Sequence, residues 1–450
     1  MSVEIPTPGQ PDPAELASGS ASGSASASAA PGRRSLWRHP DFMKLWSAQT
    51  ISLLGDEMTG LAVPLIAILL LHATAFEMGI LGTLLFLPFI LLTLPAGAWV
   101  DRMRRRPILI SADLGRAAIL LSIPAAYALG VLTLIQLYVC AFAVGCLQVF
   151  FDVAYQSYLP VVVERDQLVE GNAKLEISRS AAALPGPGVA GLLISVVSAP
   201  FAIIVDAISF LGSATLLTLI RRPESKPERQ VDAVTGKHES MRTEITEGWR
   251  YVIRHEYLRN IAACTGTLNL FGNIAGVILL LYAVRQLHMQ PAVIGLIFAI
   301  GNVGTLVAAF STERVTRWLG LGRTIVLSAL ASGPAAVLIA IAPRDNALPF
   351  LIASFTLTSL TNVIYNVNQV SLRQAITPER MQGRMNATMR FIVWGTIPVG
   401  SIIGGFLGDA IGLQPTLWVG AIGSFVGFLP VLLSPVRSLK HIPEAEPAAA

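Results

Sequence analysis

Apolar stretches of about twenty residues, the length at which a helix spans the hydrocarbon core of a bilayer, recur along the whole chain. Short charged segments separate them. Only 13% of the residues are charged, whereas a soluble domain has about 25%. The pattern therefore predicts an all-α membrane protein with twelve transmembrane helices. We place the spans at residues 43–71, 78–100, 107–129, 131–153, 173–196, 200–220, 259–284, 291–312, 322–342, 347–369, 387–409 and 414–435.

The basic residues predict how these spans are oriented. Of the 32 Lys and Arg residues, only Arg285 and Arg344 fall on one side of the predicted spans, and Arg116 lies inside the third span. Lys and Arg accumulate in cytoplasmic loops. We therefore expect a multi-pass protein of the bacterial cytoplasmic membrane with both termini in the cytoplasm. The net charge of +4 then reflects the basic cytoplasmic loops, and we expect no nucleic-acid partner.

The longest predicted loop divides the chain into two similar halves. Asn172-Ala173 and Asn386-Ala387 lie at the start of spans five and eleven, and the acidic-basic pairs Asp101-Arg102 and Glu313-Arg314 follow spans two and eight. Two six-helix halves with a substrate site between them are typical of transporters. We expect an Ala/Ser/Gly-rich cytoplasmic tail at 1–35, an N-terminal half at 36–220, a linker with an amphipathic segment (247–259) at 221–258, a C-terminal half at 259–436 and a tail at 437–450.

Three motifs resemble those of the major facilitator superfamily, over about residues 36–436. The loop after span two, GAWVDRMRRRP (97–107), is similar to the family pattern G-x-x-x-D-R-x-G-x-R-R, with departures at Arg104 and Pro107. The residues that fit are Gly97, Asp101, Arg102 and Arg106. Span five holds GPGVAG (186–191), which resembles the exporter motif G-P-x-x-G-G through Gly186, Pro187 and Gly191. The run from Leu159-Pro160 to Gly186-Pro187 resembles the branch that contains macrolide efflux proteins and the enterobactin exporter.

The resemblance implies a secondary active exporter of small amphipathic molecules that works by alternating access and proton antiport. It also implies that the loop motif, together with Asp113 and Arg116 of span three, latches one half to the other in one conformation. The alternative is a static ion pair between Asp113 and Arg116, which stand at i and i+3 on one helix face. Many proton-coupled members carry an Arg in span four, and this span has none. Pro187 is expected to bend span five.

Asp56, about midway through span one, is the first candidate for a proton-binding group. A charged residue in hydrocarbon costs about 2.5–3.5 kcal/mol and usually faces a cavity. Glu57 lies on a different face of the same helix. In the alternative, Asp56 caps a helix break near Gly55 or bonds a neighbouring helix. The polar stripe around Asp56 consists of Gln49, Ser52 and Thr59.

Spans seven and ten carry comparable stripes. The resemblance places spans one, four, seven and ten around the central cavity, where amides and hydroxyls suit neutral or mixed substrates. Hydrogen bonds between helices are the alternative role. Asp152 is expected to join the span-three charges, whereas Asp206 and Asp409 are expected to be interfacial. The proposed cavity residues are Asn269, Asn273, Asn362 and Tyr365, with Thr265, Gly276, Thr358 and Gln369 on the same stripes.

Motifs of other protein classes are absent from the sequence. It contains no P-loop, HExxH or GxSxG, and neither its three Cys nor its six His residues have metal-ligand spacing. We therefore expect a monomeric transporter with no enzymatic activity, no metal and no cofactor, whose partners are a small-molecule substrate, protons and the lipid bilayer. Three rivals remain: a dedicated siderophore or natural-product exporter, a passive facilitator, and a non-transporting scaffold or sensor.

Overall fold

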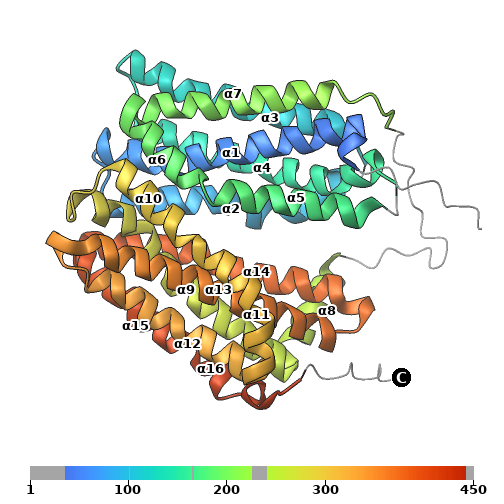
Figure 1. Cartoon of the computed structure of the whole chain (residues 1–450), viewed down its shortest axis with the longest axis vertical. Coiled ribbons are helices and arrows are strands. Elements are labelled where there is room, and N and C mark those ends of the chain that lie inside the picture. The colour runs from blue at the N-terminus through green and yellow to red at the C-terminus, as the bar shows by residue number, and fades with distance from the viewer. Residues whose placement is uncertain (1–35, 101, 165–166, 225–240, 442–450) are drawn as a thin grey trace, which may run out of the picture.

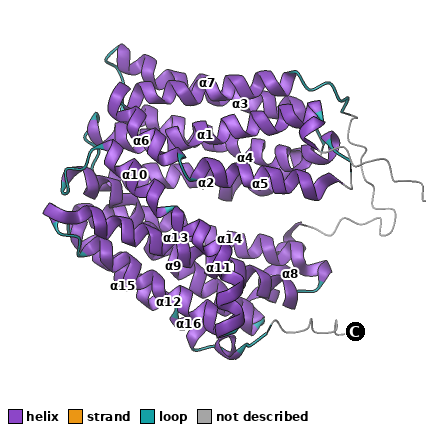
Figure 2. Cartoon of the chain, in the orientation of Figure 1, coloured by secondary structure: helices purple, strands orange, loops and turns teal. Residues whose placement is uncertain are grey.

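The computed structural model describes residues 36–100, 102–164, 167–224 and 241–441. Within these residues the regular elements are helices (Figure 2). The α-helices are α1 (Pro40–Leu69), α2 (Ala75–Val100), α3 (Arg105–Ala128), α4 (Leu134–Val162), α5 (Leu168–Ala183), α6 (Gly186–Val197), α7 (Ala199–Thr218), α8 (Met241–Arg254), α9 (Glu256–Arg285), α10 (Pro291–Gly301), α11 (Val303–Leu319), α12 (Leu321–Ala340), α13 (Ala347–Ile376), α14 (Glu379–Ala410), α15 (Leu413–Gly427) and α16 (Leu429–Leu432).

The number of membrane-spanning helices agrees with the sequence. Among the described residues, eleven spans are long and apolar enough to cross a bilayer, and the bent pair α5–α6 makes a twelfth. The turns between spans are tight. Gly130, Gly320 and Gly412 have positive φ angles of 69°, 83° and 92°, which glycine adopts without steric cost.

The helices form two bundles, α1–α7 and α9–α16, which Figure 1 shows above and below one another. We call the side that holds Leu36 and His441 the terminal face, and the opposite side the distal face. The two bundles meet toward the distal face, and their helices diverge toward the terminal face (Figure 1). The two bundles are therefore closest to each other at the distal face.

The closest approach of the bundles is made by glycines near the distal ends of the helices. A Cβ added at Gly405 of α14 would lie 2.9 Å from the Cα of Gly79 in α2, and one added at Gly191 of α6 would lie 2.9 Å from the Cα of Gly295 in α10. Real Cβ atoms do not approach this closely. Small residues let membrane helices approach backbone to backbone, so these four glycines allow the distal ends to close.

Polar contacts add to this distal interface. The carboxylate of Asp409 accepts hydrogen bonds from the backbone N–H groups of Ala75 (2.9 Å) and Phe76 (3.0 Å), at the start of α2. The Arg285 guanidinium donates to the Ala73 carbonyl at 2.8 Å. Asp409 therefore caps a helix of the opposite bundle from the exposed end of α14, a contact that the sequence did not predict.

One span is bent near its middle, and another has a one-residue irregularity near its middle. Span five bends by 41° between α5 and α6, where Pro185 and Pro187 lack the N–H groups that a straight helix would use. Span eight is interrupted at Asn302, between α10 and α11. The Asn302 amide donates a hydrogen bond of 2.7 Å to the carbonyl of Ala183, the last residue of α5. The bend and the irregularity thus face each other across the bundle interface.

Several helices extend beyond the predicted spans. Helix α14 begins at Glu379, eight residues before the predicted edge at 387, and α11 continues to Leu319 instead of ending at 312. Glu313-Arg314 therefore lies inside a helix, unlike Arg102, which lies in a turn after α2. The predicted amphipathic segment divides at His255: its first part belongs to α8, which packs on α14 through Gly248, and the rest begins α9.

Candidate functional site

A buried arginine organises the interior of the first bundle. Arg116 of α3 has no solvent-exposed surface. Its guanidinium lies over the rings of Phe151 (4.5 Å to the centroid) and Phe210 (4.0 Å), an arrangement that stabilises a cation. It forms an ion pair with Asp113 and a hydrogen bond with Gln148 of α4. These contacts fix the charge in one position between α3, α4 and α7.

Asp56 contacts this arginine from α1. Its Oδ1 lies 4.0 Å from Nη1 of Arg116, and its side chain is 37% exposed, whereas Asp113 and Arg116 are fully buried. Helix α1 continues without a break through Gly55, so the capping role suggested for Asp56 is wrong. Gly55 instead allows close packing on Ser209 of α7. Asp56 is therefore accessible to solvent, whereas Asp113 is not.

Asp206 of α7 is a second acid that the sequence placed incorrectly. It was expected at the membrane interface, but it is fully buried. It accepts hydrogen bonds from Thr59 of α1 and from Ser209, the latter at 3.1 Å. These hydroxyls solvate the carboxylate in place of water. Thr59 thus belongs to the same polar interior of the bundle as Asp56.

Asp152 completes the group through α4. Gln148 donates to the Asp152 carboxylate at 3.0 Å and contacts Arg116 through its carbonyl oxygen. Asp152 therefore belongs to the span-three network, as expected. Helix α4 has no arginine, but its Gln148 accepts a hydrogen bond from Arg116 of α3. We name Asp56, Asp113, Arg116, Gln148, Asp152 and Asp206 the Arg116 cluster.

The charge balance of the Arg116 cluster indicates its chemistry. It contains four carboxylates and one guanidinium. Buried charges that lack a partner are strongly destabilising, so a cluster with excess acid is stabilised when a proton binds. Among the described residues, no three His, Cys, Asp or Glu side chains converge as metal ligands.

The remaining members of the Asp56 stripe are buried in the bundle. Gln49 is 7% exposed and Ser52 is 1% exposed. Glu57 points toward α6, where a Cβ at Gly186 would lie 2.9 Å from the Glu57 Cβ. Asp56 and Glu57 therefore have different surroundings, as the helix geometry predicts.

The second bundle contains a cavity of about 620 Å³. Sites for small molecules measure roughly 300–1,000 Å³. Residues of α9, α12, α13, α14 and α15 line it. The structure brings together all four cavity residues named from the sequence: Asn269, Asn273, Asn362 and Tyr365.

Two of the cavity amides donate hydrogen bonds to backbone carbonyls. Asn273 donates to the Asn269 carbonyl at 2.8 Å, and Asn269 donates to the Val393 carbonyl at 3.2 Å. The hydroxyls of Tyr365 and Thr265 lie 2.7 Å apart. Asn362 is exposed on the cavity wall. Both readings of the polar stripes thus apply: they join helices and line a cavity.

Sequence reasoning missed two cations in this cavity, Arg373 of α13 and Arg390 of α14. Both were counted with the loop arginines of one face. Arg390 lies eleven residues into α14, and its guanidinium is 5.6 Å from the Trp394 ring centroid. Its position inside predicted span 387–409 was the available signal.

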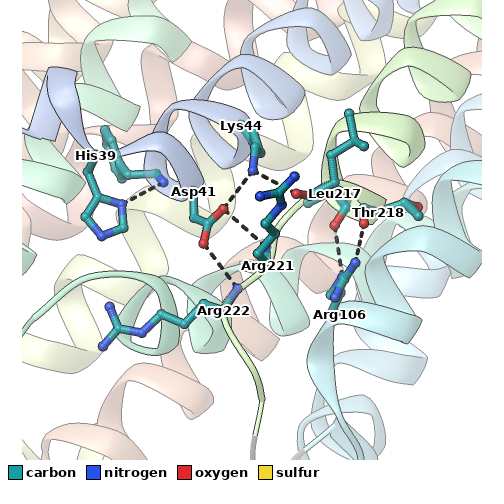
Figure 3. A network of polar contacts seen from close by, with 10 residues as sticks. His39, Asp41, Lys44, Arg106, Leu217, Thr218, Arg221 and Arg222 are labelled. Atoms are coloured by element: carbon teal, nitrogen blue, oxygen red, sulfur yellow. Dashed lines mark hydrogen bonds and ion pairs between the residues drawn. The ribbon is translucent and has the colours of Figure 1, made fainter.

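The loop motif lies at the terminal face and contacts its own bundle. Arg106 donates to the carbonyls of Leu217 (3.0 Å) and Thr218 at the end of α7 (Figure 3). Asp41 of α1 accepts from the backbone N–H groups of Arg221 and Arg222 just beyond (Figure 3). The network thus joins α1, α3 and the end of α7.

The other motif residues are separate from this network. Arg102 is exposed, Gly97 is half-buried in α2, and Asp101 lies outside the described residues. The Asp113–Arg116 pair was expected beside the loop motif, but it belongs to the Arg116 cluster.

Two six-helix bundles with a cavity and a buried charge cluster are the architecture of a membrane transporter. A sequence profile of the transmembrane secretion effector family matches residues 32–448, and the chain belongs to that family.

Curated relatives of the chain are distant but nearly full length. The multidrug efflux pump Tap of Mycolicibacterium fortuitum is 25% identical over 418 residues, which cover 89% of this chain and 97% of that protein. The enterobactin exporter EntS of Salmonella choleraesuis is 24% identical over 404 residues, covering 89% of this chain and 88% of that protein. The resemblance to this branch is therefore confirmed.

Solved structures share the fold at lower identity. A bacterial homologue of the iron transporter ferroportin, in an inward-facing state, has a TM-score of 0.71 at 17% identity and covers 89% of this chain and 99% of that one. A mutant of the nucleoside transporter NupG has a TM-score of 0.70 at 11% identity, with 87% and 99% covered. At these identities the likeness concerns the fold alone.

Proposed function

We propose that this protein is a secondary active exporter of small amphipathic molecules that exchanges substrate for protons by alternating access. It acts as a monomer in the cytoplasmic membrane, with the terminal face and both termini in the cytoplasm. The two halves, 36–220 and 259–436, move as two bodies around the central site. The basic residues of the sequence support this orientation, and the efflux activity of the relative Tap supports export.

The observation that carries the proposal is the contact between Asp56 and Arg116. The acid is 37% exposed and the base is fully buried. A proton that binds Asp56 from solvent removes its attraction to Arg116 and weakens the contact between α1 and α3. This links proton binding to helix position, which a coupled exporter requires.

The arrangement of the bundles supports an inward-facing state. Glycine contacts and the bonds of Arg285 and Asp409 close the distal face, and the helices diverge toward the terminal face (Figure 1). Under the proposed topology, substrate enters from the cytoplasm. Opening the distal face requires these contacts to separate.

The test is uptake of a fluorescent amphipathic dye into inverted membrane vesicles with an imposed pH gradient. We expect uptake that collapses when a protonophore is added, and Asp56→Asn to abolish the response to the gradient. Glu256→Gln, at an exposed acid at the start of α9, serves as the control and should keep it. Gradient-driven uptake by Asp56→Asn would remove Asp56 from the proposed role.

A dedicated siderophore or natural-product exporter is the second candidate. The relationship to the enterobactin exporter favours it. A competition panel of drugs and siderophores against dye transport separates the two: inhibition by many unrelated compounds supports a broad exporter, and inhibition by one chemical class supports a dedicated one.

A further inference from the structure

We propose that Arg373 and Arg390 form an anion-binding subsite in the cavity of the second bundle, and that the molecules bound there are amphipathic anions. The inference rests on the proposed function, because it names the chemical class that the exporter recognises. It concerns two side chains to which sequence patterning gave no role.

The position of the two arginines is the first argument. They come from two helices, α13 and α14, and line one cavity together with the amides of Gln369 and Asn362. None of the described residues that line this cavity is Asp or Glu. The cavity wall is therefore positively charged.

The surroundings of Arg373 are the second argument. Its Nε is buried and has no hydrogen-bond partner among the described residues. The Tyr365 hydroxyl and a second cation, Arg390, line the same cavity as Arg373. Two neighbouring cations repel each other, so a bound anion stabilises both. Guanidinium groups present paired donors that match the two oxygens of a carboxylate, sulfonate or phosphate.

The remaining wall indicates what accompanies the acidic group. Val393 and Trp394 lie about one turn from Arg390 on α14, and Phe355 lies on α13. Trp394 also meets Phe89 of α2 in an edge-to-face contact at 6.4 Å, so an aromatic surface extends to the first bundle. A ligand with an acidic group and an apolar or aromatic body suits this wall.

The charge of the first bundle is the third argument, because it affects where an anion binds. The Arg116 cluster contains four carboxylates and one guanidinium, and it repels an anion. An acidic ligand is therefore held on the α13–α14 side, and protonation of the Arg116 cluster reduces the repulsion from across the interface. This links anion binding to the proton site without direct contact.

The experiment measures binding with two dyes of similar ring system and opposite charge. The protein is reconstituted in phosphatidylcholine nanodiscs, and fluorescence anisotropy follows carboxyfluorescein, an anion, and rhodamine 123, a cation. We expect Arg373→Gln and Arg390→Gln each to weaken carboxyfluorescein binding roughly tenfold or more, the usual effect of losing a hydrogen bond to a charged group. Rhodamine 123 binding should be unchanged or stronger.

The controls separate charge from folding. Arg323→Gln removes an exposed arginine at the start of α12 and should leave both dyes unaffected. Arg373→Lys and Arg390→Lys keep the charge and should retain more anion affinity than the Gln variants. Equal loss of both dyes in the Gln and Lys variants alike, or wild-type carboxyfluorescein binding in both Gln variants, overturns the proposal.

An anionic lipid headgroup offers the same chemistry as a soluble anion, and a second arm distinguishes them. Phosphatidylglycerol is added to the nanodiscs. Competition with carboxyfluorescein that disappears in the Gln variants identifies lipid as an occupant of the anion subsite, and no competition assigns the subsite to soluble anions. Because the readout is binding, the subsite can fail while proton-driven transport of rhodamine 123 persists, and it can hold in a protein that transports neither dye.

Discussion

Asp409, at the end of α14, accepts a hydrogen bond of 2.9 Å from the backbone N–H of Ala75, 334 positions away in the sequence. Phe76 donates to the other carboxylate oxygen at 3.0 Å. The start of α2 has N–H groups without helical partners and a partial positive charge. One acid of the second bundle thus caps a helix of the first, and we expect this bond to break when the distal face opens.

The first prediction concerns Asp409→Ala. Loss of a charged cap costs about 1–2 kcal/mol, and the cost falls only on the distally closed state. We expect a shift of roughly tenfold toward the distally open state. Spin labels at Arg102 and Arg323, exposed on opposite bundles at the terminal face, should report a larger population at short distance by double electron–electron resonance.

The matched control for Asp409→Ala is Asp345→Ala. Asp345 is an exposed acid in the loop before α13, on the same distal face. Its replacement should leave the distance distribution unchanged. An identical distribution in Asp409→Ala and the wild type would contradict a role for this cap in closure.

The second prediction concerns the glycine contact between α2 and α14. In Gly405→Ala the new Cβ would lie 2.6 Å from the Ala75 carbonyl oxygen and 2.9 Å from the Gly79 Cα, both backbone atoms. The helices must therefore separate, and we expect dye transport to fall at least about tenfold as closure loses backbone packing. Gly395→Ala, in the same helix, meets no atom within 4 Å and should transport normally.

The third prediction concerns the stability of the Arg116 cluster. Arg116→Leu leaves Asp113 buried without its partner, which costs about 3–5 kcal/mol. Thermal unfolding of the purified protein should show a large decrease in Tm. Asp113→Leu combined with Arg116→Leu should recover much of it, because the pair is removed together. A double variant less stable than Arg116→Leu would mean that the acid does not depend on this arginine.

The fourth prediction compares two asparagines of α13. Asn362 is exposed on the cavity wall, so Asn362→Ala should weaken dye binding about threefold to tenfold and leave Tm unchanged. Asn368 is 4% exposed and bonds the Thr316 hydroxyl at 2.9 Å. Asn368→Ala should lower Tm with little change in dye binding. Opposite results would reverse the assignment of the two amides.

The fold could be predicted because hydropathy and length determine which segments enter a bilayer. The predicted ends of the spans were less accurate where a helix extends beyond the bilayer. The charged start of α14, from Glu379, is helical but has no apolar signal. The break at Asn302 was also missed, because a single residue interrupts an otherwise apolar segment.

The site was predicted in part because periodicity identifies faces but not depth or partners. It grouped Asn269 and Asn273 on one face of α9, and the cavity contains both. It could not reveal that the Thr59 hydroxyl donates a hydrogen bond to Asp206, which lies 147 residues further along the sequence. Arg373 and Arg390 were missed because counting charges by side treats a cavity arginine as a loop arginine.

The hydrogen bond from Asn302 to Ala183 has a consequence for how far each part of the molecule travels. In a rocking motion, displacement grows with distance from the axis, and this bond joins the bend of span five to the irregularity at Asn302, both near the middle of their spans. We therefore expect it to keep its length of 2.7 Å when the distal face opens. The bonds of Asp409 and Arg285, at the far end of the lever arm, must break. Asn302 would then be the fulcrum of the molecule.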